Sequence, residues 1–450
     1  MVEQSSILRT VPFKDFSKWD VKRFFIKQIQ SSYPVLFLSE LLNEETEKKK
    51  LSKFPKEVFG ILGVSNEVGM FDAYTEMGSN IKQPYKIVKN DFIAYNPYRV
   101  NVGSIGIKKA SLKNDYISNA YVVFSTKEKL LADYLYLLMH TPRFNQLIRD
   151  NTTGSVRQTL SFENLCKIAV PVPTITEQNS ILQKYQEIIA QANKLESKAE
   201  ELSQNISNEL INLLGITVGA KSEKNHSVLT FVKYSKCSRW DVDYILGKHS
   251  VDYIFTSKYP IINTRNIILS CQYGSSSKAD KNSNNTPVLR MNNIQDGEFN
   301  INDLKYLNLS QKDLTTYKLN KGDLLFNRTN SKELVGKTAV FEYDGDYVFA
   351  SYLIRVVIDS TKANVHYINY LFGSQIIRDQ INSISRQITG QANVNAEELK
   401  DLIFPLPPLP IQNKIVSHIN QIKKQVKDLN EKAKDLREQA KKEFEGSVFE

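Results

Sequence analysis

The chain has 450 residues, of which 59 are Lys or Arg and 49 are Asp or Glu, and its formal net charge at pH 7 is +10. This length is too great for one comfortable hydrophobic core and predicts two or more domains. No run approaches the about 18 uncharged apolar residues of a membrane span, and the N-terminus is too polar for a signal peptide, so a membrane protein and a secreted protein are both disfavoured.

The cysteines Cys166, Cys237 and Cys271 are too widely spaced for a zinc site or a disulfide framework. We therefore expect a reducing, cytoplasmic setting and no metal site. The excess of positive charge favours a polyanionic partner. Many basic proteins bind no nucleic acid, however, so charge alone does not decide between the two classes.

The only two tryptophans occur in two similar stretches, "SKWDVKRFF" around Trp19 and "SRWDVDYIL" around Trp240. Each Trp is followed by Asp-Val and preceded by Ser and a cation. We interpret the stretches as the entries of two copies of one unit. Both tryptophans are predicted to be core anchors and not DNA-stacking residues, since the adjoining Asp20 and Asp241 would repel phosphate.

Further matches follow in the same order along the chain. "VPVPTITEQNSI" (170–181) matches "FPLPPLPIQNKI" (404–415) at an offset of 234, and "YKIVKNDFIAYN" (85–96) matches "YKLNKGDLLFN" (317–327). The order never reverses, as in duplicated domains that carry loop insertions. The sequence therefore predicts a tandem duplication of a unit of roughly 220 residues.

The body of each copy mixes strand and helix patterns. Helical spacing runs through residues 127–150 in the first copy and 365–382 in the second. In the second copy, residues 347–358 are rich in aromatic and β-branched residues and predict a strand, and the Asp-Gly in "QDGEFN" (295–300) predicts a turn. Each body is thus expected to be a compact α+β domain.

Basic and amide-rich loops are the candidate contacts to a polyanion. They are "YNPYRVNVGS" (95–104) and "NTTGSVRQT" (151–159) in the first copy, and "RMNNIQ" (290–295), "NRTNSKE" (327–333) and "SRQITGQAN" (385–393) in the second. Arg, Asn and Gln reach guanine or adenine edges with two hydrogen bonds. The alternative that many of these residues sit in ordinary surface turns stays open. The candidate DNA-binding residues are Tyr98, Arg99, Asn101, Ser104, Arg157, Gln158, Arg290, Asn292, Asn293, Arg328, Asn330, Lys332, Arg386 and Gln391.

After each Pro-x-Pro step a long polar helix is predicted, because proline blocks an earlier helix start. Apolar residues then recur at alternating spacings of four and three, the pattern of a coiled-coil seam. An amphipathic helix lying on a globular core would show a wider apolar stripe. The predicted seam residues are Ile181, Tyr185, Ile188, Leu195 and Leu202 in the first helix, and Ile415, Ile419, Ile422, Leu429 and Leu436 in the second.

These patterns together predict an α+β fold in which two similar α/β domains are separated by two long helices. The helices are expected to form an antiparallel coiled coil with pseudo-two-fold symmetry, although a parallel pair or pairing with another chain leaves the same pattern. The predicted boundaries are a first domain at 1–175, a first helix at 176–214, a linker at 215–236, a second domain at 237–405 and a second helix at 406–450.

No catalytic centre is predicted. "YNPYR" (95–99) is similar to the Asn-Pro-Pro-Tyr element that receives a flipped adenine in amino-methyltransferases. One proline is missing, no Gly-rich cofactor loop accompanies it, and the aligned "FNRTN" (326–330) lacks the element. A phosphate-binding P-loop is also absent, and the five histidines show no metal-ligand spacing. The sequence favours a binding protein without catalytic or metal-binding residues.

The arrangement of domain, helix, domain and helix resembles the specificity (S) subunit of type I restriction-modification systems. The resemblance covers essentially the whole chain and rests on the two Pro-x-Pro stretches, the Trp-Asp entries, "GDLLFNR" (322–328) and the Thr-Gly pairs before each helix. The first copy departs from the family pattern, since it has "PVPTIT" where the second has "PLPPLP".

The resemblance implies a non-catalytic subunit in which each domain reads one half of an interrupted double-stranded DNA target and the helices set the gap. It also implies docking of two modification (methyltransferase) subunits, with restriction (motor-nuclease) subunits joining for cleavage. S-adenosylmethionine, ATP and magnesium would then belong to those partners. Two alternatives remain open at this stage: a recognition subunit of a methyltransferase-only system, and a duplicated protein- or glycan-binding adaptor.

Overall fold

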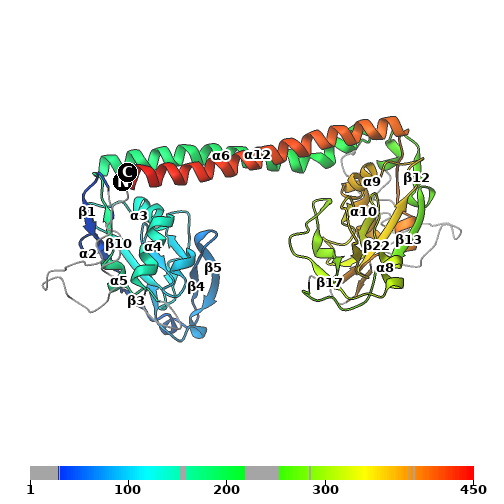
Figure 1. The fold of residues 1–450 in the computed structure, drawn as a ribbon. Helices are drawn as coiled ribbons and strands as arrows, with labels where there is room; N and C mark the ends of the chain where they lie inside the picture. Colours follow the sequence, from blue (N-terminus) through cyan, green and yellow to red (C-terminus); the bar gives the residue numbers. More distant parts are fainter. Residues whose placement is uncertain are drawn as a thin grey trace. The chain divides into compact units, whose positions relative to one another are not determined.

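The computed structural model describes residues 29, 31–152, 159–217, 253–282, 285–384, 386–388 and 391–449. The chain divides into two compact units: unit one is 1–195 with 431–450, and unit two is 196–430. Figure 1 shows that each unit consists of a mixed body and one end of both long helices, α6 (Ile175–Leu213) and α12 (Leu409–Phe449). Within the described ranges, no helix is long and apolar enough to cross a membrane. Trp19, Trp240, Arg157, Gln158 and Cys237 lie outside these ranges.

The body of unit one holds a four-stranded antiparallel sheet with the order β2-β10-β7-β8 and a five-stranded sheet with the order β3-β6-β9-β4-β5. The short strand β11 pairs with β1 and leads into α6. The bounds are β1 (Val35–Phe37), α2 (Leu38–Leu41), β2 (Leu42–Glu44), β3 (Lys48–Lys49), β4 (Val58–Ser65), β5 (Gly69–Met77), β6 (Tyr85–Ile87), β7 (Ile93–Tyr95), β8 (Ile105–Ile107), β9 (Tyr116–Ile117), β10 (Val122–Thr126), α3 (Ala132–Met139), α4 (Pro142–Asn151), α5 (Phe162–Cys166) and β11 (Ala169–Pro171).

Unit two has a corresponding four-stranded antiparallel sheet with the order β13-β22-β18-β20, and β25 pairs with β12 before α12 begins. Two three-stranded sheets, β17-β14-β21 and β19-β24-β23, are added to it. The bounds are β12 (Ile261–Asn263), β13 (Ile268–Tyr273), β14 (Thr286–Leu289), β15 (Ile294–Gln295), β16 (Glu298–Phe299), β17 (Lys305–Leu307), α8 (Gln311–Tyr317), β18 (Leu324–Asn327), β19 (Thr329–Asn330), β20 (Thr338–Val340), β21 (Val348–Phe349), β22 (Leu353–Ile358), α9 (Val365–Phe372), α10 (Gln375–Ile384), β23 (Arg386–Ile388), β24 (Gln391–Asn393), α11 (Ala396–Lys400) and β25 (Ile403–Pro405).

The predicted duplication is confirmed at the level of single hydrogen bonds. The buried Tyr134 donates its hydroxyl to the carbonyl of Pro171 in unit one, and the buried Tyr367 does the same to Pro405 in unit two. The turn before β7 has a left-handed residue, Asp91 (φ 64°), and the turn before β18 has Gly322 (φ 90°) at the matching position. Both copies therefore fold the same sequence pattern in the same way.

The segments with helical spacing, 127–150 and 365–382, are helical in the structure, and each forms two short helices, α3 and α4 in unit one and α9 and α10 in unit two. Pro142 occupies the first turn of α4, where its missing N–H is harmless, and Thr141 caps the helix by accepting from Phe144 N. In unit two, Gly373 ends α9 and α10 begins at Gln375. Each pair forms two sides of its domain core, which one straight helix would not do.

The predicted strand at 347–358 is also divided. β21 belongs to the β17-β14-β21 sheet, whereas β22 is the second strand of the four-stranded sheet, and the backbone changes sheets between them. The Asp-Gly turn is confirmed: Asp296 (φ 51°) and Gly297 (φ 79°) connect β15 to β16 in a two-residue hairpin.

The two long helices run antiparallel within each unit. In unit one, Arg437 Nη2 donates to Asn193 Oδ1, and the rings of Tyr185 and Phe444 lie 6.1 Å apart. In unit two, His418 Nε2 lies 3.0 Å from Glu209 Oε1. Residue numbers rise on one helix as they fall on the other, so the predicted antiparallel pairing is confirmed.

The predicted seam residues are all buried or half-buried, while most residues between them are exposed. Toward the helix ends the apolar stripe widens and joins the domain cores. Phe444, Val448 and Phe449 pack into the core of unit one, and Ile415, Val416 and Ile419 into that of unit two. The middle of each helix is thus a narrow seam, and the ends are amphipathic helices lying on a globular core.

Candidate nucleic-acid interface

The loop between β7 and β8 in unit one and the loop between β18 and β20 in unit two occupy equivalent places. Asn96 N donates to Ser104 O at the base of the first loop, and Asn327 N donates to Lys337 O at the base of the second. A later segment also bonds to each loop in the same way, through Leu160 N to Pro97 O and Val394 N to Arg328 O. The alignment of these loops predicted from the sequence is therefore confirmed, and they carry different side chains.

The loop of unit one presents Tyr98 and Arg99 to solvent. Tyr98 is 58% exposed, and its backbone N–H donates to Asn96 Oδ1 in a local turn. The carbonyl of Asn101 accepts from Asn145 Nδ2 of α4, which fixes the far side of the loop. Tyr98 and Arg99 are consequently well placed to contact a ligand from an anchored backbone.

Ser104, a predicted base-reading residue, is placed differently. Its side chain is only 5% exposed, and Oγ donates to the carbonyl of Val64 at 3.2 Å. Tyr95 is also fully buried; its hydroxyl donates to Leu160 O, and burial raises its pKa. This geometry argues against direct base contact by Ser104 and against a flipped base stacking on Tyr95.

We expect Ser104→Ala to lower the free energy of unfolding by about 1 kcal/mol, the usual contribution of one hydrogen bond. Any DNA sequence preference of the chain should stay unchanged, because the hydroxyl faces the protein. Selection of bound sequences from a random DNA pool, together with hydrogen exchange of peptides from 58–77, tests both parts. A changed sequence preference would restore Ser104 to the candidate base contacts.

In unit two, β19 forms one small sheet with β23 and β24, which lie more than 50 residues later in the sequence. β24 lies between β19 and β23, so that Asn330 pairs with Ala392 and Arg386 pairs with Asn393. Asn330 Nδ2 also reaches Met291 Sδ at 3.5 Å, which adds the loop after β14. The structure thus brings together the predicted residues near 290, 330 and 390 and defines one candidate interface.

The predicted residues near 290 divide into structural and exposed ones. Asn293 is buried, and its amide donates to the carbonyls of Asn300 and Asp303. Arg290 donates to the carbonyl of Asp303 and lies 3.7 Å from its carboxylate. These contacts hold the loop, so Asn293 is not available to a base edge, whereas Asn292 is exposed.

A half-buried arginine from α10 fixes the loop that carries Lys332. Arg378 donates to the carbonyls of Lys332, Glu333 and Val335, and its burial lowers the pKa of the guanidinium. Lys332 itself projects into solvent. The loop therefore presents a cation from a backbone held by three carbonyl contacts.

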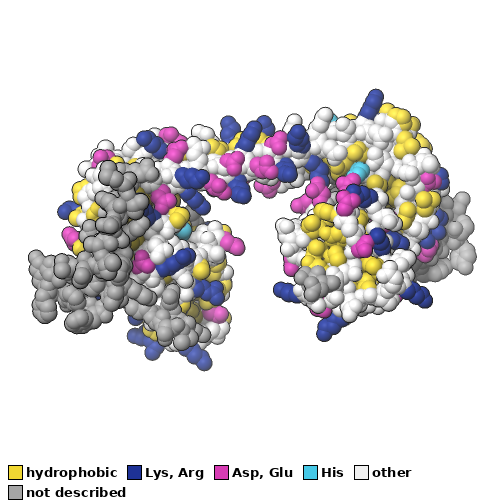
Figure 2. Space-filling view, in the orientation of Figure 1, with side chains coloured by type: hydrophobic (Ala, Val, Ile, Leu, Met, Phe, Trp, Pro, Cys, Tyr) yellow, Lys and Arg dark blue, Asp and Glu magenta, His cyan; other side chains and the backbone are white. Residues whose placement is uncertain are grey.

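Unit one carries a group of exposed lysines that was not predicted as a site. The group lies in β3 and in the segment that follows it, and consists of Lys48, Lys50, Lys53 and Lys56. Among the described residues, none of the four forms an ion pair. Lys49 is half-buried, with Nζ 4.9 Å from the ring centroid of Phe54. Figure 2 shows basic side chains over this end of unit one. We call the four exposed residues the lysine cluster.

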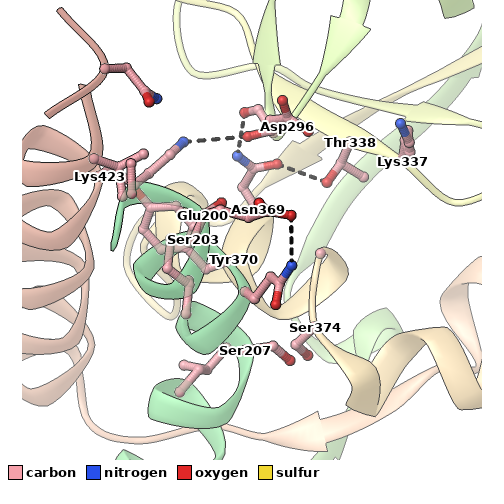
Figure 3. Close-up of a pocket in the computed structure, with 18 of the residues that line it drawn as sticks. Glu200, Ser203, Ser207, Asp296, Lys337, Thr338, Asn369, Tyr370, Ser374 and Lys423 are labelled. Carbon is pink, nitrogen blue, oxygen red and sulfur yellow. Dashed lines mark hydrogen bonds between the residues drawn. The ribbon is translucent and has the colours of Figure 1, made fainter. Parts of the chain in front are cut away.

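A pocket of about 790 Å³ lies inside unit two between α9, α6 and α12 (Figure 3). Thr338 Oγ1 donates to Asn369 Oδ1 at 2.7 Å, Asn369 Nδ2 donates to Gly297 O, and Lys423 Nζ donates to Glu298 Oε1. These bonds join the β15–β16 hairpin to the helices. The residues that line the pocket include none of the predicted DNA-binding residues. Within the described part of the chain, no group of three or more His, Cys, Asp or Glu could hold a metal.

Two buried glutamines at the helix starts have roles that sequence reasoning missed. Gln178 Nε2 donates to the carbonyls of Pro173 and Lys129, and its Oε1 accepts from Leu131 N. Gln412 repeats the pattern with Pro407, Lys362 and Asn364. Both side chains are 0% exposed. The identical spacing of Gln after Pro-x-Pro in both copies was the available signal.

The chain has two matched bodies with equivalent anchored loops. Each body is joined to a long helix of an antiparallel pair. These features define the class as a duplicated binding protein with long connecting helices. Residues 35–204 and residues 267–437 each match the family described as the type I restriction modification DNA specificity domain. The chain belongs to this family and carries two copies of its domain. The description agrees with the predicted role in DNA specificity.

Relatives and a solved structure agree with this assignment. The chain is 26% identical over 258 residues to the EcoKI specificity subunit of Escherichia coli (strain K12), covering 57% of this chain but only 50% of the relative. It is 22% identical over 421 residues to the StySPI specificity subunit of Salmonella potsdam, covering 93% and 80%. A solved chain described under "complex assembly and conformational transition of the type I R-M system" shares the fold, with a TM-score of 0.57 at 14% identity, covering 94% and 98%.

Proposed function

We propose that the chain is the sequence-specific DNA-recognition subunit of a type I restriction-modification complex. The observation that carries the proposal is the pair of equivalent loops, anchored by the same backbone bonds but with Pro97 in one copy where the other has Arg328. Equal scaffolds with unequal side chains suit a protein that reads two unlike half-sites. Because each half-site is read by its own unit, the target is an interrupted sequence.

In this proposal, different residues contact the phosphates and the bases of the DNA. The lysine cluster contacts the DNA backbone of the first half-site, where compact positive charges set position without reading sequence. Tyr98, Arg99 and Asn101 lie on the anchored loop of unit one and contact bases. In unit two, the β19-β24-β23 sheet and Asn292 take that role.

The long helices set the gap and dock two modification subunits, which methylate adenine, while restriction subunits join for cleavage. S-adenosylmethionine, ATP and magnesium are bound by those partners, and the complex works in the cytoplasm. A methyltransferase-only system uses the same recognition subunit, and the two differ in whether a motor-nuclease subunit joins the complex. The narrow middle of the seam supports the spacer role, since Ala192 and Ala433 are fully buried there while the residues flanking them are exposed.

A domain exchange tests the proposal. Residues 1–175 are replaced by the corresponding domain of another family member, and adenine methylation is mapped across the genome of cells that also express the modification subunit. We expect one half-site of the motif to change while the other half-site and the gap stay the same. Binding of the complete complex to a duplex with the native motif should fall steeply as salt rises.

Two results would contradict the proposal: methylation that is identical with and without the chain, or an exchange that alters both half-sites. Binding of a protein or glycan that does not depend on salt, with no binding to DNA, would favour the adaptor alternative instead.

A further inference from the structure

A tyrosine outside the predicted loops forms a platform beneath Arg328. Tyr273 ends β13, and its hydroxyl accepts a hydrogen bond from Ala396 N at the start of α11 (3.1 Å). The Cζ atom of Arg328 lies 4.8 Å from the centroid of this ring, a distance at which guanidinium and tyrosine attract. The ring is anchored at the strand and at its hydroxyl, so it restricts where the guanidinium can lie.

A second contact restrains Arg328 from the neighbouring strand. Its Nη2 lies 3.4 Å from Asn393 Oδ1, and Asn393 pairs with Thr329 and Arg386 in the β19-β24-β23 sheet. The backbone of Arg328 is fixed as well, because its N–H donates to Tyr352 O and its carbonyl accepts from Val394 N. The guanidinium is thus held by a ring on one face and an amide at one edge.

Arg328 differs from the other half-buried arginines of unit two in its charge balance. Arg290 lies near the carboxylate of Asp303, Arg355 near that of Asp323, and Arg378 donates to three carbonyls. In the part of the chain that is described, Arg328 has no carboxylate within 4 Å, and its guanidinium donates to one acceptor, Asn393 Oδ1. Its Nε has no hydrogen-bond partner, as is also true of Arg290 and Arg355. A half-buried cation that is oriented but not paired with a carboxylate favours a ligand that supplies acceptors.

We infer that Tyr273 and Asn393 position Arg328 to read a guanine in the half-site recognised by unit two. Guanine presents N7 and O6 side by side in the major groove, and a fixed guanidinium donates to both through its terminal nitrogens. Tyr273 is a positioning residue in this arrangement and Arg328 the specificity-determining one. The inference rests on the proposed function. It adds the identity of one recognised base, a guanine, and the residue that contacts it, Arg328.

At the position equivalent to Arg328, the described part of the first unit has no arginine. The position of Arg328 is occupied by Pro97, whose side chain has no donor. The inference therefore applies to one half-site only. This asymmetry provides an internal control, since discrimination in the first half-site must come from other residues.

The test uses the complete complex of the chain with its modification subunits and the motif established by methylation mapping. Each guanine of the second half-site is replaced singly by 7-deazaguanine, which lacks the N7 acceptor, and the dissociation constant is measured. For the unaltered chain we expect one replacement to weaken binding about tenfold or more, since a bidentate contact discriminates by that order. In Arg328→Gln the same replacement should change binding by less than about twofold.

Variants of the platform separate positioning from folding. Tyr273→Leu should reduce the 7-deazaguanine penalty to about threefold, and Tyr273→Phe should retain most of it because the ring remains. The matched control is Tyr352→Leu. It keeps the backbone carbonyl that accepts from Arg328 N and removes a ring that has no contact with the Arg328 guanidinium among the described residues, so the full penalty should remain. Retained discrimination at the other base pairs of the second half-site reports that unit two of each variant is folded.

The possible failures are distinguishable. If the unaltered complex shows no sequence-specific binding, the proposed function fails. If it binds specifically but no 7-deazaguanine in the second half-site matters, or if the penalty survives in Arg328→Gln, the inference alone is overturned. A penalty that survives in Tyr273→Leu overturns the positioning role of the tyrosine.

Discussion

Deleting one matched heptad from both long helices should shorten the gap between the half-sites by about three base pairs and leave both half-site sequences unchanged. Seven helical residues rise about 10.5 Å, which is about three steps of 3.4 Å along DNA. Suitable segments are 195–201 and 429–435, which correspond under the 234-residue repeat. Because their deletion removes one whole heptad from each helix, the buried Ala192 and Ala440 stay on the seam. Mapping methylated adenines in cells with the variant measures the gap.

Methylation by this variant should also be slower. Removing about three base pairs rotates one half-site by roughly a third of a turn about the duplex axis. One unit must therefore change its orientation to contact the groove of that half-site, which costs free energy. A matched insertion of one heptad at the same places should lengthen the gap by the same amount. As a control, deleting three residues from each helix shifts the seam out of phase and should abolish specific methylation. An unchanged gap in the heptad variant, with methylation retained, would contradict the spacer role.

Long-range order was well predicted because it rests on repetition. The two Pro-x-Pro stretches, the matched loops and the seam residues all have a counterpart in the other copy, and each pair occupies the same place in its unit. The repeat also carried the prediction of the antiparallel helices. Their direction, however, was chosen on symmetry, and the physical evidence for it is the pair of contacts Arg437–Asn193 and Phe444–Tyr185 in unit one.

Local interruptions were predicted less well, although signals were present. Thr141-Pro142 is a typical helix start, and it divides the segment that helical spacing alone treats as continuous. Gly373 ends α9 and divides the second segment, but a single glycine is a weaker sequence signal for a helix end than Thr-Pro is for a helix start. The change of sheet after Phe349 follows from packing against β14, which no local pattern reveals.

The reading residues were the least predictable part of the site. Ser and Asn bond to protein backbone as readily as to a base, so Ser104 and Asn293 have the right chemistry but face inward. Tyr273 was missed for the opposite reason. Its role depends on Arg328 and Ala396, and no spacing in the sequence connects these three residues.

Replacing Gln412 by alanine should lower the free energy of unfolding of unit two by about 3 kcal/mol. The side chain is 0% exposed and makes three hydrogen bonds: a buried one to Pro407 O and partly buried ones to Lys362 O and Asn364 N. Alanine would leave two carbonyls and one N–H without these partners, at about 1 kcal/mol each. Amide hydrogen exchange of peptides from 360–372 should accelerate about a hundredfold where exchange reports this opening.

The repeat supplies the comparison for this prediction. Gln178→Ala should destabilise unit one by a similar amount, since Gln178 makes the same three bonds with Pro173, Lys129 and Leu131. The two effects should add in the double variant, because the sites share no partner. Gln425→Ala is the matched control: this glutamine is exposed on the same helix as Gln412, so its replacement should change the free energy by less than about 0.5 kcal/mol. Equal effects of Gln412→Ala and Gln425→Ala would show that the buried amide does not hold the helix to its domain, and that packing of Ile415, Val416 and Ile419 alone secures the junction.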